Sequence, residues 1–188
     1  MMRLTPLQRY EQALQSTEFS EDPQQRMAMT YLDTVSRELQ DFNPDKGFFG
    51  FFKPDPKPPK GLYMWGGVGR GKTWMMDMFF DAVTIERKMR MHFHHFMKDV
   101  HKQLNALSGQ ANPLVSVADN IHNKAILICF DEFFVSNVSD AMILGDLFTL
   151  LFERGITLVA TSNIEPSGLY KDGLHRDRFL PAIAEFWH

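Results

Sequence analysis

The chain has 188 residues, which allows one domain of ordinary size and excludes a second large catalytic domain. Hydrophobic residues make up 44%, charged residues 23% and aromatic residues 13% of the chain, which excludes a disordered or collagen-like protein. The formal net charge of -3 argues against a protein dedicated to binding nucleic acid.

The sequence predicts a cytoplasmic protein. Its one cysteine, Cys129, lies in an apolar run and cannot form a disulfide within the chain, which is typical of a reducing compartment. Residues 1–10 lack the apolar segment of a secretory signal, and no apolar stretch approaches the roughly 18 residues of a membrane-spanning helix.

Two helices are predicted in residues 1–41, the N-terminal helical segment. Apolar residues recur there at helical spacing, and Asp22 and Pro23 suit the N-cap and the first position of the second helix. Residues 42–60 are rich in proline and are predicted to form a surface loop. The phenylalanine cluster at 48–52 either folds back onto the domain or presents a patch to a partner or a membrane surface, and the sequence favours neither.

Predicted strands and helices alternate over residues 61–188, which is typical of a parallel sheet covered by helices on both faces. The predicted strands are 61–65, 90–96, 125–130 and 156–161, and the predicted helices are 72–89, 97–107, 113–122 and 139–154, with a short helix after Asn163. The first, third and fourth strands are continuous apolar runs, as in strands buried on both faces. We therefore expect an α/β fold with a three-layer αβα core, preceded by the N-terminal helices.

A glycine-rich motif lies directly between the first predicted strand and the first helix of this core. It has the form G-x-x-x-x-G-K-[ST] and comprises Gly66, Gly67, Val68, Gly69, Arg70, Gly71, Lys72 and Thr73. In such a loop, backbone N–H groups surround phosphate oxygens, the lysine reaches the terminal phosphates and the hydroxyl group ligates Mg²⁺. A glycine-rich turn that matches by chance is disfavoured, because both flanking elements are the expected ones.

Two acids follow the third predicted strand. Asp131 and Glu132 come directly after the apolar run 125–130, at the edge of a parallel sheet where ligands bind. We expect Asp131 to hold Mg²⁺, directly or through water, and Glu132 to polarise the water that attacks the γ-phosphate. The alternative is that both acids cap the next turn. The phosphate-binding motif in the same chain favours the catalytic interpretation.

Three polar residues late in the chain are further candidates for contacts with a nucleotide. Asn163 follows the fourth predicted strand, where its side chain would reach the γ-phosphate, although Ser-Asn is also ordinary turn chemistry. Arg176 and Arg178 lie where oligomeric ATPases present an arginine to the nucleotide of a neighbouring subunit. Surface pairing with Asp172 or Asp177 is an equally weighted alternative.

Four histidines lie close together in the sequence, at His92, His94, His95 and His101. In a strand over 90–96, His92 and His94 would share one face and His95 would lie on the other, so three histidines would not converge on one ion. The sequence therefore favours histidines without a metal-binding role.

The order of these motifs resembles the core of an AAA+ ATPase, which is a P-loop NTPase fold. The stretches KGLYMWGGVGRGKTWMMDMFF, RMHFHHFM, ILICFDEFFVSNVSDAMILGDLF and TLVATSNIEPSGLYKDGLHRDRFLPAI resemble the ZapE family of bacterial cell-division ATPases and their mitochondrial relatives. The resemblance implies hydrolysis of ATP with Mg²⁺ and a homo-oligomer in the full-length protein. For the bacterial members it implies association with the division ring of FtsZ, whose polymers they destabilise.

The resemblance also assigns roles to single residues. It implies that Gln24 or Gln25, with Gln25 preferred, lies near the adenine, and that Arg178 rather than Arg176 reaches a neighbouring site. The motif matches are residues 66–73 for the phosphate loop, Asp131 for the metal-binding acid, Glu132 for the water-activating acid and Asn163 for the first sensor.

The chain departs from the family at its C-terminal end. Family members continue beyond His188 through a fifth sheet strand and a helical lid, so we expect a fragment that lacks the lid. Loss of the lid would weaken nucleotide binding. Loss of the strand would leave an exposed apolar edge beside the strand at 61–65.

Two other interpretations share these motifs. A helicase-loader-like ATPase acting on DNA is disfavoured by the acidic charge balance and by the lack of a basic run. A nucleotide-dependent adaptor that does not hydrolyse ATP would hold a protein or membrane partner through the cluster at 48–52.

Overall fold

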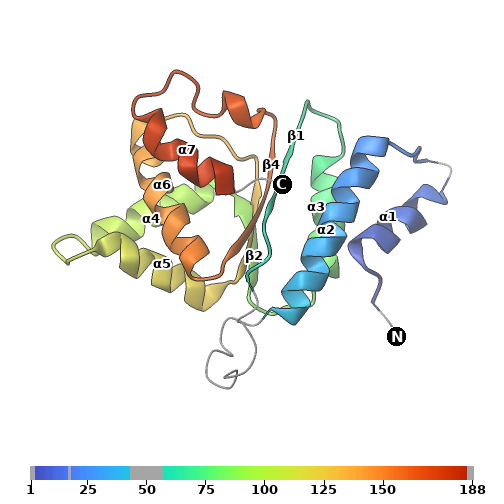
Figure 1. Ribbon diagram of the computed structural model, residues 1–188, viewed down its shortest axis with the longest axis horizontal. Coiled ribbons are helices and arrows are strands. Elements are labelled where there is room, and N and C mark those ends of the chain that lie inside the picture. The colour runs from blue at the N-terminus through green and yellow to red at the C-terminus, as the bar shows by residue number, and fades with distance from the viewer. Residues whose placement is uncertain (1–2, 17, 43–56, 186–188) are drawn as a thin grey trace.

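Four parallel strands form a sheet in the order β1-β4-β3-β2 (Figure 1). The computed structural model describes residues 3–16, 18–42 and 57–185. The strands are β1 (Leu62–Trp65), β2 (Lys88–His92), β3 (Leu127–Asp131) and β4 (Thr157–Ser162). Each described strand pair is parallel, so the carboxyl ends of the strands lie along one edge of the sheet.

Helices cover both faces of this sheet (Figure 1). One face carries α1 (Pro6–Leu14), α2 (Pro23–Asp41) and α3 (Lys72–Ala82). The other carries α4 (Phe93–Ala106), α5 (Pro113–Lys124), α6 (Val138–Glu153) and α7 (Arg176–Glu185), and the short 3-10 helix η2 (Pro166–Gly168) follows β4. The predicted three-layer αβα architecture is confirmed.

Alternate residues of the central strands point to opposite faces of the sheet. In β3, Leu127 and Cys129 pack with α2 and α3, whereas Ile128 and Phe130 pack with the helices of the other face. All four side chains are fully buried, which explains the continuous apolar run. Burial raises the pKa of the Cys129 thiol, so this side chain stays protonated and acts as a small apolar group.

The N-terminal helices share a core with α3 and the sheet. Asp22 caps α2 by accepting the backbone N–H of Gln24 at 2.8 Å, and Pro23 takes the first helical position, as predicted. The carboxylate of Asp33 on α2 accepts the N–H of Leu7 at 3.2 Å. These contacts hold α1 and α2 against each other beside the phosphate-loop helix.

The strand predicted at 90–96 was wrong in its second half. β2 ends at His92 and α4 begins at Phe93, because the next apolar residues repeat at intervals of three and four, which is helical spacing. The buried residues of α4 are Phe93, Phe96, Met97 and Val100.

The helix predicted over 72–89 ends earlier than expected, at Ala82. The ammonium of Lys88 donates to the carbonyl of Val83 at 2.8 Å, and Lys88 itself pairs with Leu127 in the sheet. Pairing with β3 therefore converts the end of this segment into a strand, which local spacing did not reveal.

The expected exposed apolar edge is only partly present. Within the described ranges β1 pairs with β4 alone, but Leu62, Tyr63 and Met64 are buried and only Trp65 is exposed. The free edge of β1 therefore presents backbone N–H and C=O groups rather than apolar side chains. The cluster at 48–52 lies outside the described residues.

We expect Phe148→Ala to destabilise the protein by about 3 to 5 kcal/mol, because it opens a cavity in the core. Phe148 is fully buried, and its ring centroid lies 6.3 Å from that of Phe130 and 6.1 Å from that of Phe133. Phe134 is 54% exposed, so Phe134→Ala should change stability by no more than roughly 0.5 kcal/mol. Urea unfolding measures both variants, and equal losses would contradict the packing described.

Candidate active site

The phosphate loop connects β1 to α3 at the carboxyl edge of the sheet, as predicted. Gly69 and Gly71 have φ angles of 81° and 78°, in the left-handed region that favours glycine. A Cβ atom at Gly71 would also lie 2.8 Å from Nε2 of Gln25. The backbone conformation therefore favours glycine at position 71, whereas the contact with Gln25 involves the end of a flexible side chain.

Lys72 lies across this loop. Its ammonium donates to the carbonyls of Gly66 at 2.7 Å and of Gly67 at 2.8 Å. Burial, and then repulsion from Arg70, lower the pKa of Lys72. The lysine is therefore held at the loop, at the position from which a phosphate-loop lysine reaches the terminal phosphates.

Asp131 ends β3 and is held by an arginine of the adjacent strand. Arg90 on β2 donates from Nε to Oδ2 of Asp131 at 2.8 Å and from Nη2 to Oδ1 at 3.1 Å. Nη1 of Arg90 also binds Asp77 on α3. Arg90 was not among the predicted site residues, and the available signal was a basic residue in the strand predicted at 90–96.

Glu132 takes a left-handed backbone conformation with φ of 55°. Its N–H donates to Oγ1 of Thr161 on β4 at 3.2 Å, which anchors this conformation. The Glu132 side chain is 79% exposed, and its carboxylate lies 3.7 Å from Nδ1 of His92. The carboxylate is therefore open to solvent at the carboxyl edge of the sheet.

The segment after β4 is fixed by buried hydrogen bonds. Oγ of Ser162 donates to the carbonyl of Phe133 at 2.7 Å and accepts the N–H of Ile164 at 3.1 Å. Burial raises the pKa of Tyr63 to about 12, so its hydroxyl stays protonated and donates to the carbonyl of Ile164 at 2.8 Å. Asn163 is held between these contacts, and β4 lies between β1 and β3.

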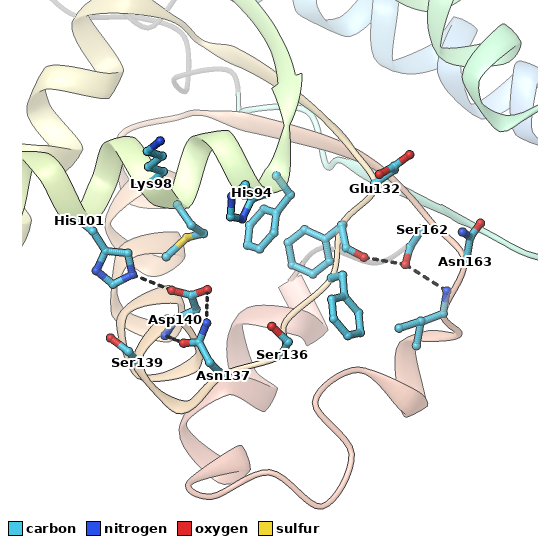
Figure 2. A pocket seen from close by; sticks show the side chains of 15 residues that line it. His94, Lys98, His101, Glu132, Ser136, Asn137, Ser139, Asp140, Ser162 and Asn163 are labelled. Carbon is cyan, nitrogen blue, oxygen red and sulfur yellow. Dashed lines mark hydrogen bonds and ion pairs between the residues drawn. The ribbon is translucent and has the colours of Figure 1, made fainter.

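A pocket of about 910 Å³ extends from these residues toward the start of α6. Figure 2 shows Glu132 and Asn163 at one end and the pair His101–Asp140 at the other, joined at 2.6 Å. Aromatic side chains lie between these ends, and the pocket lining includes Phe93, Phe133 and Phe134. The sequence reasoning did not anticipate this pocket, because residues from α4, α6 and β4 form it.

A second cleft, of about 630 Å³, lies between α2, β1 and the phosphate loop. Gln25 lines it and donates from Nε2 to the carbonyl of Arg70 at 3.1 Å, while Oε1 of Gln24 accepts from the Arg70 guanidinium. Both glutamines therefore contact the phosphate loop.

The two late arginines differ in their contacts. Arg176 donates to the carbonyls of Leu169 at 3.2 Å and Ser167 at 3.0 Å, so its side chain stabilises the segment before α7. Arg178 is exposed, and among the described residues its side chain forms no hydrogen bond or ion pair. Neither arginine pairs with Asp172 or Asp177 within that part of the chain.

Thr73 and Asp131 offer the oxygen ligands that suit Mg²⁺. This ion is usually held by one or two carboxylates together with substrate phosphates and water. The histidines are arranged differently from the strand prediction, since only His92 lies in β2 and the other three lie on α4. In the described ranges, no group of three or more His, Cys, Asp or Glu side chains could hold a metal ion.

The family of the chain follows from its match to a family model. A model of the AFG1-like ATPase family matches residues 4–186. The chain belongs to the AFG1-like ATPase family. It is 48% identical to Cell division protein ZapE of Escherichia coli, over 97% of this chain and 52% of that protein. It is also 45% identical to Lactation elevated protein 1 homolog B of Danio rerio, over 68% of this chain and 28% of that protein. The chain thus spans about half the length of the bacterial relative.

Solved structures share this fold of a parallel sheet between helices. DnaA of Aquifex aeolicus bound to AMPPCP matches with a TM-score of 0.60 and 16% identity, over 90% of this chain and 47% of that chain. DnaI matches with a TM-score of 0.55 and 14% identity, over 90% of this chain and 84% of that one. At such identities the likeness concerns the fold alone.

In the part of the chain that the structure describes, no helix is both long enough and apolar enough to cross a bilayer.

We expect Thr161→Val to lower ATP turnover by roughly 10-fold to 100-fold, because Glu132 loses the contact that fixes its backbone. Thr157→Val is the matched control, since Thr157 is equally buried on β4 and donates to the carbonyl of Pro59 at the far end of the strand. Each variant should lose about 1 to 3 kcal/mol of stability, which urea unfolding measures. Equal turnover in the two variants would show that this contact does not position Glu132.

Proposed function

We propose that the chain is the nucleotide-binding core of an ATPase that binds ATP with Mg²⁺ and hydrolyses it. One observation carries this proposal: the phosphate loop after β1 and the acids at the end of β3 flank the same strand, β4, at one edge of the sheet. Ligands of parallel α/β sheets bind at that edge.

The residues at this edge have separate roles in the proposed hydrolysis. Lys72 and the first N–H groups of α3 bind the terminal phosphates, and Thr73 and Asp131 would hold Mg²⁺, which supplies charge neutralisation at the phosphate oxygens. Glu132 takes a proton from the attacking water, and Asn163 orients that water. The water oxygen bonds to the γ-phosphorus while the bond to the bridging oxygen breaks, which leaves ADP and phosphate.

The cleft beside α2 is the proposed site for the base of the nucleotide. Gln25 lines this cleft and contacts the phosphate loop, so one side chain touches both regions. Tyr31, Met64 and Met75 line the same space and offer surface for a flat ring.

A protein partner in cell division is the proposed target of the hydrolysis cycle. The relative in Escherichia coli is named a cell division protein. From the resemblance of the motifs to the ZapE family, we propose FtsZ polymers in the cytoplasm as the target. We also propose a homo-oligomer in which Arg178 completes a neighbouring site, because its side chain is exposed and unengaged among the described residues.

We expect Glu132→Gln to bind ATP as the unaltered protein does but to hydrolyse it about 100-fold to 10,000-fold more slowly, because the amide cannot accept the proton of water. A fluorescent ATP analogue measures binding, and phosphate release measures turnover. Glu153→Gln, at the exposed end of α6, is the control. An active Glu132→Gln variant would exclude the assigned role.

We expect the turnover per mole of chain to rise with protein concentration, because each complete site would need Arg178 from a neighbour. Arg178→Ala should lower the turnover at high concentration by roughly 1,000-fold. Mixing Arg178→Ala with Glu132→Gln should restore activity, since one variant keeps the catalytic acid and the other keeps the arginine. A rate independent of concentration, with no recovery on mixing, would rule out completion of the site in trans.

A further inference from the structure

We propose, on the basis of the Mg²⁺ site proposed above, that Arg90 is a positioning residue for that site. Its guanidinium holds the Asp131 carboxylate in the orientation needed to receive the ion or a water bound to it. The phosphate-binding motif and the acidic pair do not include Arg90, which lies on the neighbouring strand.

The first support is the geometry of the contact between Arg90 and Asp131. The two nitrogens Nε and Nη2 each meet a different carboxylate oxygen, at 2.8 Å and 3.1 Å, which fixes the plane of the carboxylate. Each oxygen has two lone pairs, so one on each remains for a cation or its water. The side chains of Arg90 and Asp131 are only 19% and 16% exposed, so solvent competes little for this contact.

The second support is the contact of Arg90 with another acid, Asp77. Asp77 lies on α3 four residues after Thr73, and residues at this spacing share one face of a helix. The contact of Arg90 with Asp77 therefore ties the strand that carries Asp131 to the helix that carries Thr73. One guanidinium thus links the elements that bear both proposed metal ligands.

The charge of this group also suits the role. An arginine guanidinium is charged at any ordinary pH, so Arg90 places one positive charge against the two acidic side chains that it binds. The cluster remains attractive to a divalent cation while its acids stay ordered.

The test is a Mg²⁺ titration of the binding of a fluorescent ATP analogue, compared with binding in EDTA. Arg90→Lys keeps the charge and loses the planar fork, so we expect the apparent affinity for Mg²⁺ to fall about 10-fold, as for other groups that orient metal ligands. Binding in EDTA should stay unchanged, because the phosphate loop is not altered. Arg154→Lys is the matched control, since Arg154 is 20% exposed and binds Asp119 at 2.7 Å, on the far side of the fold.

A second variant keeps the inference testable if Arg90→Lys fails to fold, which thermal unfolding reveals. Asp77 is 53% exposed, so Asp77→Asn should fold and show a smaller loss of Mg²⁺ affinity in the same direction. An apparent Mg²⁺ affinity equal to that of the unaltered protein in both variants would contradict the inference, because Arg90 would then only link the elements structurally. Tighter Mg²⁺ binding in the variants would also contradict it, because Arg90 would then compete with the ion for Asp131. If the unaltered protein binds the analogue equally well with and without Mg²⁺, the proposed metal site and the role of Arg90 both fail. If Mg²⁺ strengthens analogue binding equally in the unaltered protein and in both variants, the metal site stands and only the role of Arg90 fails.

Discussion

The parallel pairing of β1, β4 and β3 is the constraint on which the site depends. β4 pairs with Leu62 to Trp65 on one side and with residues 127–130 on the other. Because parallel strands present their carboxyl ends at the same edge, this pairing brings together three segments that are far apart in the chain. The phosphate loop, the acids and Asn163 are neighbours only through this ladder.

Hydrogen bonds from neighbouring elements hold the phosphate loop and the backbone at Glu132 in place. Gln24 and Gln25 hold the phosphate loop from α2, and Thr161 holds the left-handed backbone at Glu132. The hydroxyl group of Ser162 fixes the segments after β3 and after β4 through its hydrogen bonds with Phe133 and Ile164. The backbone at the site is thereby ordered, while the carboxylate of Glu132 remains exposed.

Charge at this edge is balanced across three elements. Lys72 and the start of α3 supply positive potential at the phosphate loop, and the acids supply negative potential at the end of β3. Arg90 lies on β2, contacts acids on β3 and α3, and neutralises part of the acidic charge without blocking every lone pair of Asp131. A carboxylate without such a partner would be freer to change its orientation.

The sequence by itself determined the layered fold, the phosphate loop and the acidic pair, because these depend on local patterns: apolar runs for buried strands, and glycine, lysine and acid at strand ends. It did not determine where β2 gave way to α4, since Phe93 fits both the alternation of a strand and the spacing of a helix. Only the tertiary structure placed Arg90 on Asp131, 41 residues away, and Thr161 on Glu132, 29 residues away. Such contacts follow from which strands become neighbours and in which register, and no local pattern specifies that pairing.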